Sequence, residues 1–345
     1  MYEMNMGTVS LVIVRSSEHQ SPGHPEGPHR FRSIRGELTE HLTDKITWLE
    51  PIVVGEDVLT AVHPKSYLRF IQESAANGPG IVDYGDTYVT QSSYQDALNA
   101  IAGAITTLDA ISSGQTQKGF AIIRPPGHHA SEQKAMGFCL FNNIAIATRR
   151  AQSQGFKRLA IVDFDVHHGN GTQDIFYADP DVLYISTHQW GIFPGTGAKT
   201  EVGSQEGEGT IINIPLPGGV GDLGFERAFN QIIGPALERF SPDMLLVSAG
   251  YDAHNQDPLA GLQVTSRGFF EMTSKLAGFA DKLCAGKMLM LLEGGYNPEA
   301  LSVSVRNSCL ALAGLELSDE PEREKQISEP SIQDSLEEIR KIHSL

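Results

Sequence analysis

Short apolar runs recur along the chain and alternate with longer stretches of helical periodicity. The runs are rich in aliphatic and β-branched residues, which is typical of strands buried on both faces. Strands that alternate with helices predict an α/β fold in which helices cover both faces of a parallel sheet. The predicted strands are Val9–Val14, Gly119–Ile123, Leu159–Asp163, Val182–Ser186, Thr210–Ile214, Met244–Ser248 and Lys287–Leu292.

The clearest helical pattern spans Tyr94–Ile111, with Ser93 as the expected N-cap and Gly114 as the expected stop. Two stretches without a period, Glu18–Arg32 and Gly191–Gly209, are rich in Gly and polar residues and predict long, functional loops. The apolar positions of the helical pattern are Ala97, Ile101, Ile105 and Leu108.

The composition changes near residue 316, so we expect a single domain over residues 1–315 and a charged tail over residues 316–345. Glu316–Glu329 is charged and contains proline, which predicts an extended or mobile segment. Ser331–His343 predicts a short amphipathic helix whose apolar face is formed by Leu336, Ile339 and Ile342.

Charge and cysteine usage exclude some classes of function. A net charge of −16 argues against a general nucleic-acid binder and favours cationic peptides or polyamines as partners. The 3 cysteines lie far apart, which excludes a disulfide framework and a thiolate zinc site. No apolar run is long enough for a membrane span, and the N-terminus lacks signal-peptide features. We therefore expect a cytoplasmic protein of bacterial or organellar type, with no nucleic-acid or membrane partner and no prediction for its oligomeric state.

Reactive residues follow several of the predicted strands. Because the carboxyl ends of parallel strands meet at one edge of a sheet, these residues predict one shared site. They lie in the segments Arg124–His129, Asp163–His168, Ser186–His188, Ser248–Asp252 and Glu293–Asn297.

The segment LAIVDFDVHHGNGT carries the strongest chemical signal. Strand alternation would point Asp163, Asp165 and His167 to the same side. Carboxylates with an imidazole suit a divalent metal such as zinc. The alternative is a strand end with capping aspartates, but unpaired carboxylates beside a core are costly to desolvate. Asp252 in SAGYDAHNQDP is the expected third ligand, with a turn-forming aspartate as the alternative.

Two adjacent histidines, His128 and His129, follow a Pro-Pro-Gly turn. We interpret them as general base and acid beside a metal, with Asp163 and Asn170 as orienting partners. The alternative is one metal ligand and one surface histidine. Tyr296 in LEGGYN follows two glycines that permit a tight backbone path, so its hydroxyl could donate to an oxyanion, or its ring could pack under a turn.

Six motifs, in this order, resemble the histone deacetylase superfamily, and specifically its class II-like branch: RPPGHHA, GFCLFNN, DFDVHHGNGTQ, FPGTG, SAGYDAHNQDP and LEGGYN. The superfamily also contains acetylpolyamine amidohydrolases and acetoin-utilisation proteins. The resemblance runs from about His24 to Arg306. It implies the arginase-like three-layer α/β fold, in which a parallel eight-stranded sheet lies between helices.

The resemblance also implies roles for individual residues. Asp165, His167 and Asp252 resemble the ligands of Zn²⁺, with Fe²⁺ as an alternative working metal. His129 resembles the general base and acid, and His128 resembles its tandem partner, paired with Asp163. Tyr296 resembles the residue that polarises the substrate carbonyl. Asn170 matches the class II pattern, where class I members carry aspartate.

Substrate and potassium sites are implied in the same way. Gly137, Phe138 and Phe193 resemble a narrow tunnel for an acyl-lysine chain. Leu259 stands near the position where a polyamine-specific relative carries glutamate, which argues against polyamine specificity. A structural K⁺ is implied, bound by the residues Asp163, Asp165, Ser186 and Thr187 and by the carbonyl group of His167.

We therefore expect a zinc-dependent deacetylase that acts on acetyl-lysine in proteins. An amidohydrolase for acetylpolyamines or other small N-acyl amines is the alternative within the same chemistry. A binuclear manganese ureohydrolase would need a second set of metal ligands and would leave RPPGHHA and LEGGYN unexplained. A non-catalytic acyl-lysine reader would not need His128, His129 and Tyr296.

Overall fold

The molecule is built on one parallel sheet of 8 strands, in the order β2-β1-β5-β10-β9-β6-β7-β8. The structure, a computed structural model, describes residues 9–317 and 328–345. It confirms the predicted α/β architecture and each predicted strand, with small differences in their bounds. The strands of the sheet are β1 (Val9–Val14), β2 (Ile46–Trp48), β5 (Lys118–Ile123), β6 (Leu159–Asp163), β7 (Val182–Gln189), β8 (Ile211–Leu216), β9 (Met244–Ala249) and β10 (Met288–Leu292).

Strand β2 was not predicted from the sequence. It is only 3 residues long, lies at the edge of the sheet and is half exposed, so it shows neither an apolar run nor an alternation. Its pairing with β1 makes it a strand. A separate antiparallel pair, β3 (Gly80–Ile81) and β4 (Tyr88–Val89), was also not predicted.

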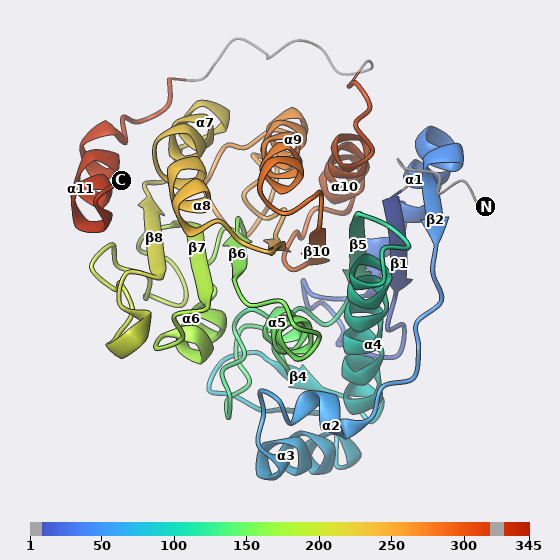
Figure 1. The fold of residues 1–345 in the computed structure, drawn as a ribbon. Helices are drawn as coiled ribbons and strands as arrows, with labels where there is room; N and C mark the ends of the chain where they lie inside the picture. Colours follow the sequence, from blue (N-terminus) through green and yellow to red (C-terminus); the bar gives the residue numbers. More distant parts are fainter. Residues whose placement is uncertain (1–8, 318–327) are drawn as a thin grey trace.

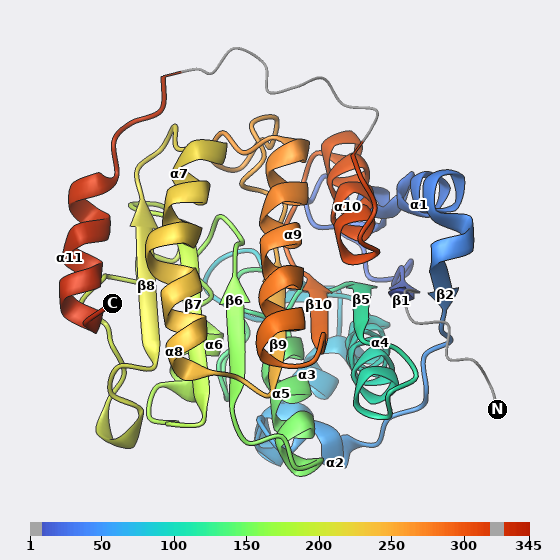
Figure 2. The ribbon, with the colours of Figure 1, turned by 45° about the horizontal axis from the view of Figure 1, so that its top comes forward.

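Helices cover both faces of the sheet, as the alternation of strands and helices predicts (Figures 1 and 2). On one side lie α1 (Ile34–Leu42), α7 (Asp222–Ala228), α8 (Gly234–Phe240), α9 (Ser266–Leu283), α10 (Pro298–Leu312) and α11 (Gln333–His343). On the other lie α2 (Glu56–Leu59), α3 (Lys65–Ala76), α4 (Ser93–Ser112), α5 (Asn143–Ser153) and α6 (Asn170–Phe176).

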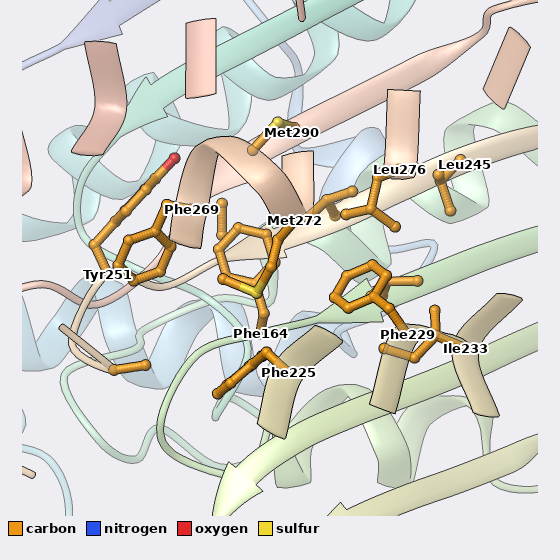
Figure 3. Close-up of a cluster of buried hydrophobic side chains, with 14 of the residues drawn as sticks. Phe164, Phe225, Phe229, Ile233, Leu245, Tyr251, Phe269, Met272, Leu276 and Met290 are labelled. Carbon is orange, nitrogen blue, oxygen red and sulfur yellow. The ribbon is translucent and has the colours of Figure 1, made fainter. Parts of the chain in front are cut away.

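Side chains of neighbouring strand residues enter opposite cores, as the pleat requires. On β6, Val162 packs in the core beneath α7–α10 and Ile161 packs in the core beneath α3–α6. Figure 3 shows the first core, where Phe164, Phe229 and Phe269 fill the space between sheet and helices. This packing holds the carboxyl ends of the central strands in place.

Helix α4 begins at Ser93, one residue before the predicted start at Tyr94. Its N-cap is Ser92, while Ser93 is the first helical residue and accepts a hydrogen bond from the Thr90 amide through its hydroxyl, at 2.6 Å. The predicted cap at Ser93 is therefore wrong by one position. The predicted stop is confirmed, because Gly114 follows the helix end with a φ of +78° that favours glycine.

Helix α11 confirms the predicted C-terminal helix, but its buried face differs from the prediction. Leu336 and Ile339 are buried, whereas Ile342 is 42% exposed and His343 takes the buried position. A helix turns once every 3.6 residues, so positions three and seven after Leu336 share its face and position six does not. The segment Glu316–Glu329 lies mostly outside the described residues, and the domain division at residue 315 remains a prediction. Among the described residues, no helix combines the length and apolarity that a membrane span requires.

Candidate active site

The central strands β6, β9 and β10 end side by side, and their following segments converge on one point. Asp163 at the end of β6 pairs in register with Ser248 of β9, and Ala249 pairs with Leu292 of β10. The segments that follow carry Asp165, Asp252 and Tyr296, respectively. The structure thus brings together residues that lie more than a hundred positions apart in the chain.

Three potential ligands meet beyond these strand ends. One ligand atom from each of Asp165, His167 and Asp252 lies within 4.8 Å of the other two. His167 Nδ1 lies 3.2 Å from both Asp165 Oδ1 and Asp252 Oδ2. The set of two carboxylates and one imidazole is a donor set that zinc accepts. We name these three residues the ligand triad.

The predicted strand alternation does not produce this convergence. Strand β6 ends at Asp163, so Asp165 and His167 lie in a loop. There, Asp163 Oδ1 accepts a hydrogen bond from the Asp165 amide at 3.1 Å, and Asp165 Oδ1 accepts one from the His167 amide at 2.9 Å. These successive Asx turns curl the backbone and direct the side chains inward. The predicted strand Leu159–Asp163 is confirmed, but the strand alternation that we applied to Asp165 and His167 does not extend beyond Asp163.

Backbone amides from other loops hold the carboxylates. Asp252 Oδ1 accepts from the Val166 amide and Asp165 Oδ2 accepts from the Gly294 amide, both at 2.9 Å. A Cβ at Gly294 would lie 2.0 Å from Asp252 Oδ2. Only glycine therefore lets the segment Glu293–Asn297, which we name the Tyr296 loop, approach the triad this closely.

The cationic partners of the triad's carboxylates are histidines. Burial alone would lower the pKa of His167, but Asp165 and Asp252 raise it to about 10. Burial and then the neighbouring Asp165 carboxylate raise the pKa of Asp252 to about 7. Burial also opposes the ionisation of Asp165, but His128 and His167 lower its pKa below the usual range. Two buried carboxylates this close together are stabilised by a divalent cation between them.

The tandem histidines lie beside the triad, with ring centroids 4.0 Å apart. His128 Nδ1 lies 3.1 Å from Asp163 Oδ2, and His129 Nδ1 lies 2.8 Å from Asn170 Oδ1. Because an amide oxygen can only accept, His129 Nδ1 carries the proton and its Nε2 has a free lone pair. The structure therefore gives each histidine a different orienting partner.

Burial and the neighbouring charges shift the pKa values of the two rings in opposite directions. Burial, followed by the charges of His128 and His167, lowers the pKa of His129 well below its ordinary value. Burial would also lower the pKa of His128, but Asp165 and Asp163 raise it to about 10. A neutral imidazole thus stands next to a protonated one, which suits proton transfer in both directions.

The Tyr296 side chain is buried. The backbone amide of Tyr296 donates a hydrogen bond to Asp257 Oδ2 at 2.7 Å. Burial raises the pKa of its phenol well above 10, so the hydroxyl keeps its proton and can donate. The Arg30 guanidinium lies 4.9 Å from the ring centroid. This cation–π contact and the amide bond hold the ring in place.

The expected tunnel residues lie around His129. Phe193 is 45% exposed, and its ring centroid is 5.1 Å from that of His129. A Cβ at Gly137 would lie 2.4 Å from His129 Cδ2 and 2.9 Å from Phe193 Cε1. Phe138 has a positive φ of +68° and its ring lies 5.8 Å from Tyr296. Leu259 lies on the surface, 39% exposed.

The residues expected to bind potassium lie behind the triad. Asp163 of β6 pairs in register with Ser186 of β7, and the Thr187 hydroxyl donates to the Asp163 carbonyl at 3.4 Å. The Ser186 hydroxyl lies 2.9 Å from His188 Nδ1. The structure places these groups together, and their role as potassium ligands remains a prediction.

Four fully buried charged residues were not assigned a role from the sequence: Glu26, Arg30, Arg124 and Glu293. Glu26 and Arg30 belong to the loop that we expected to be functional, and both side chains are fully buried. Glu293 accepts hydrogen bonds from the amides of Gly127 and His128, at 2.7 and 3.2 Å. The only signal in the sequence was a charge placed directly at the end of an apolar strand, as at Arg124 and Glu293.

Comparison with known proteins gives one consistent result. A family profile described as "Histone deacetylase domain" matches residues 24–312. The chain is 41% identical over 354 residues to "Histone deacetylase 10, chloroplastic" of Oryza sativa subsp. japonica, covering 95% of this chain and 79% of that protein. It is 39% identical over 339 residues to "Probable deacetylase" of Archaeoglobus fulgidus, covering 94% of each. The crystal structure of the HDA15 HD domain matches with a TM-score of 0.87 at 36% identity, covering 98% of this chain and 94% of that one.

Proposed function

The chain belongs to the histone deacetylase family, and on that premise we propose that it is a zinc-dependent deacetylase that hydrolyses acetyl-lysine in proteins. One observation carries the proposal. The triad of Asp165, His167 and Asp252 lies beside His129, whose Nδ1 is 2.8 Å from the Asn170 amide oxygen, so that Nε2 is the ring nitrogen available as a base. This combination supports hydrolysis more than binding alone, because a reader domain needs no general base.

The ligand triad would hold the metal, and its donor set fits Zn²⁺ or Fe²⁺. The bound metal would supply Lewis-acid polarisation of the acyl carbonyl and of the attacking water. Behind the triad, a K⁺ held near Asp163 and Ser186 would add positive charge, which we propose as a structural role.

The protein's own groups divide the remaining chemistry. His129 Nε2 would accept a proton from the attacking water, while Asn170 holds the opposite ring nitrogen. His128, kept protonated by Asp163 and Asp165, would stabilise the negative charge that develops. The Tyr296 hydroxyl would donate to the oxygen of the former carbonyl. A protonated histidine would then donate to the leaving amine.

Substrate selection would depend on the residues around His129. Gly137, Phe138 and Phe193 would form the tunnel walls that grip the aliphatic lysine stem. Leu259 provides no carboxylate for a cationic chain, which supports a peptide substrate over a polyamine. The location in the cytoplasm stays a prediction.

A paired rate assay tests the function. The protein is stripped of metal, repleted with zinc, and given an acetyl-lysine peptide or an acetylated polyamine. Faster turnover of the peptide, dependent on zinc, is the expected result. Faster turnover of the polyamine would favour a small-molecule amidohydrolase, and turnover of neither substrate would refute the proposed deacetylase activity.

A further inference from the structure

The loop that carries Phe193, residues 190–200, is tied down by one carboxylate, and we name it the Phe193 loop. Glu201 Oε2 accepts a hydrogen bond from the Gly197 amide at 3.2 Å, and Glu201 Oε1 accepts one from the Ala198 amide at 3.1 Å. Glu201 Oε2 also accepts from Gln173 Nε2 of α6, at 2.6 Å. One carboxylate therefore joins the Phe193 loop to α6, the helix that begins shortly after His167.

A second tether completes a ring of hydrogen bonds. Because Gln173 Nε2 faces Glu201, its Oε1 faces His168 Nε2 at 3.0 Å, and that nitrogen must carry the proton. His168 Nδ1 then accepts from the Thr196 hydroxyl of the Phe193 loop, at 2.8 Å. Asn213 of β8 donates to the same Gln173 oxygen at 2.7 Å, which fixes the orientation of the amide.

This network of hydrogen bonds determines where the Phe193 side chain lies. The Phe193 ring centroid is 5.1 Å from His129 and 6.2 Å from His167, and the ring edge faces Gly137. Phe193 itself is half exposed, so apolar packing alone does not hold it. A shift of the loop would change the gap between Phe193 and Gly137.

From these contacts we propose that Glu201 is a positioning residue that determines which acyl chains the site accepts. This inference rests on the proposed deacetylase function. Glu201 touches neither the ligand triad nor the tandem histidines, and acts through the backbone of the Phe193 loop. By keeping Phe193 close to Gly137, it limits the thickness of a group that can pass to the ligand triad, and so favours acetyl over branched acyl groups that are thicker than the lysine stem.

The substitution Glu201→Gln tests the proposal. An amide has one accepting oxygen, so at least one of the three donors that face Glu201 loses its partner. We expect the ratio of kcat/KM for acetyl-lysine to kcat/KM for isobutyryl-lysine peptides to fall about tenfold, because a wider gap admits the branched acyl group and small misplacements in a site can change rates by up to about 10²-fold. Zinc content should remain at the wild-type level.

Glu206→Gln is the matched control. It removes the same charge from an exposed position five residues away, in the turn Gln205–Gly207. This variant should keep the wild-type ratio. Glu201→Asp keeps the charge and should restore part of the preference. If Glu201→Gln does not fold, Thr196→Val removes the second tether without a charge change and should lower the ratio in the same direction.

Hydrogen exchange provides a readout that does not depend on turnover. Exchange of the Gly197 and Ala198 amides should speed up in Glu201→Gln and stay unchanged in Glu206→Gln. An unchanged selectivity ratio in a folded, zinc-loaded Glu201→Gln variant would overturn the proposal. If the wild type hydrolyses neither peptide, the proposed function fails, and unchanged exchange would separately show that Glu201 does not position the loop.

Discussion

Two buried clusters of charge lie at the carboxyl edge of the sheet, and their carboxylates have different cationic partners, arginines in one and histidines in the other. In the cluster of Glu26, Arg30 and Arg124, which we name the arginine cluster, Glu26 Oε1 and Oε2 accept from Arg124 at 2.8 Å each, and Arg30 adds a contact at 3.3 Å. Spare guanidinium donors bond to the carbonyls of Glu293 and Gly295. Every strong donor is thus matched to an acceptor within the chain.

The ligand triad is built differently. It places two carboxylates beside one imidazole, and their partners within the chain are backbone amides and the histidines His167 and His128. The raised pKa of Asp252 and the lowered pKa of Glu26, about 7 and about 2, express this difference. Burial raises both, but only Glu26 has Arg124 beside it to reverse the effect. A histidine is neutral when it binds a metal, so carboxylates paired with histidines, and not those paired with arginines, are where a cation from outside is expected to bind.

The largest expected difference between the two clusters is in zinc content and turnover after a substitution in the ligand triad. Asp252→Ala should lose zinc and turnover together, because the triad falls to two ligands. The apo protein should not be destabilised, since the variant removes one of two repelling carboxylates. Metal content and the zinc-dependent shift in Tm measure this. Full zinc occupancy in the folded variant would show that Asp252 is not a ligand.

The opposite result is expected in the arginine cluster. Glu26→Gln leaves two buried guanidiniums without their carboxylate and should lower the free energy of unfolding by about 3–5 kcal/mol. Zinc should still bind to the folded fraction. Urea unfolding measures the change.

The exposed pair Glu238–Lys282 gives a matched control for that measurement. Glu238→Gln should change the free energy by about 1 kcal/mol or less. Equal effects of the two substitutions would mean that the arginine cluster contributes no more than a surface ion pair.

Tyr296 stands between the two clusters, with its loop bonded to both. Tyr296→Phe removes the hydroxyl and keeps the ring that stacks on Arg30. We expect kcat to fall by about 10²–10³-fold with zinc still bound, the cost of losing one oxyanion donor. Single-turnover rates on the acetyl-lysine peptide test this, and a rate within twofold of the wild type would remove Tyr296 from the chemistry.

The smallest expected effect is on pH-dependent stability at the edge of the arginine cluster. His19 stacks on Tyr88, and burial lowers its pKa from 6.5 to about 4, against the pull of Glu26. A lowered pKa in the folded state gives stability that is complete above pH 6.5 and is lost as pH falls toward 4. Glu26 contributes in a lower window, from 4.5 down to about 2.

His19→Asn separates these windows. The difference in unfolding free energy between wild type and variant should shrink between pH 6.5 and 4 and remain constant below that. A difference that stays constant from pH 7 to 4 would contradict the assignment of a neutral, buried His19.

Much of the fold was predictable because its central strands have a clear pattern in the sequence. Strand β6 and its neighbours are buried on both faces, so they read as continuous apolar runs with reactive residues at one end. β2 escaped prediction because its identity depends on pairing with β1. Ile342 was misplaced for a local reason, because it lies six residues after Leu336, whereas His343, at seven residues, lies closer to the buried face.

The candidate site was likewise predictable in part. Local order along the chain determined that Asp165, His167, the tandem histidines and Tyr296 follow strand ends, and the family resemblance assigned their roles. How Asp165 and His167 turn inward, through hydrogen bonds to backbone amides two residues later, was not visible in the strand pattern.

The sequence by itself determined which candidate residues follow the strand ends, since strand periodicity and motif spacing are local properties. Only the tertiary structure decided which partner each buried charge has. Glu26 lies 98 residues before Arg124, and Gln173 lies 28 residues before Glu201. A charge is neutralised by whatever lies within a few ångströms of it, and that neighbour is chosen by packing, not by position in the chain.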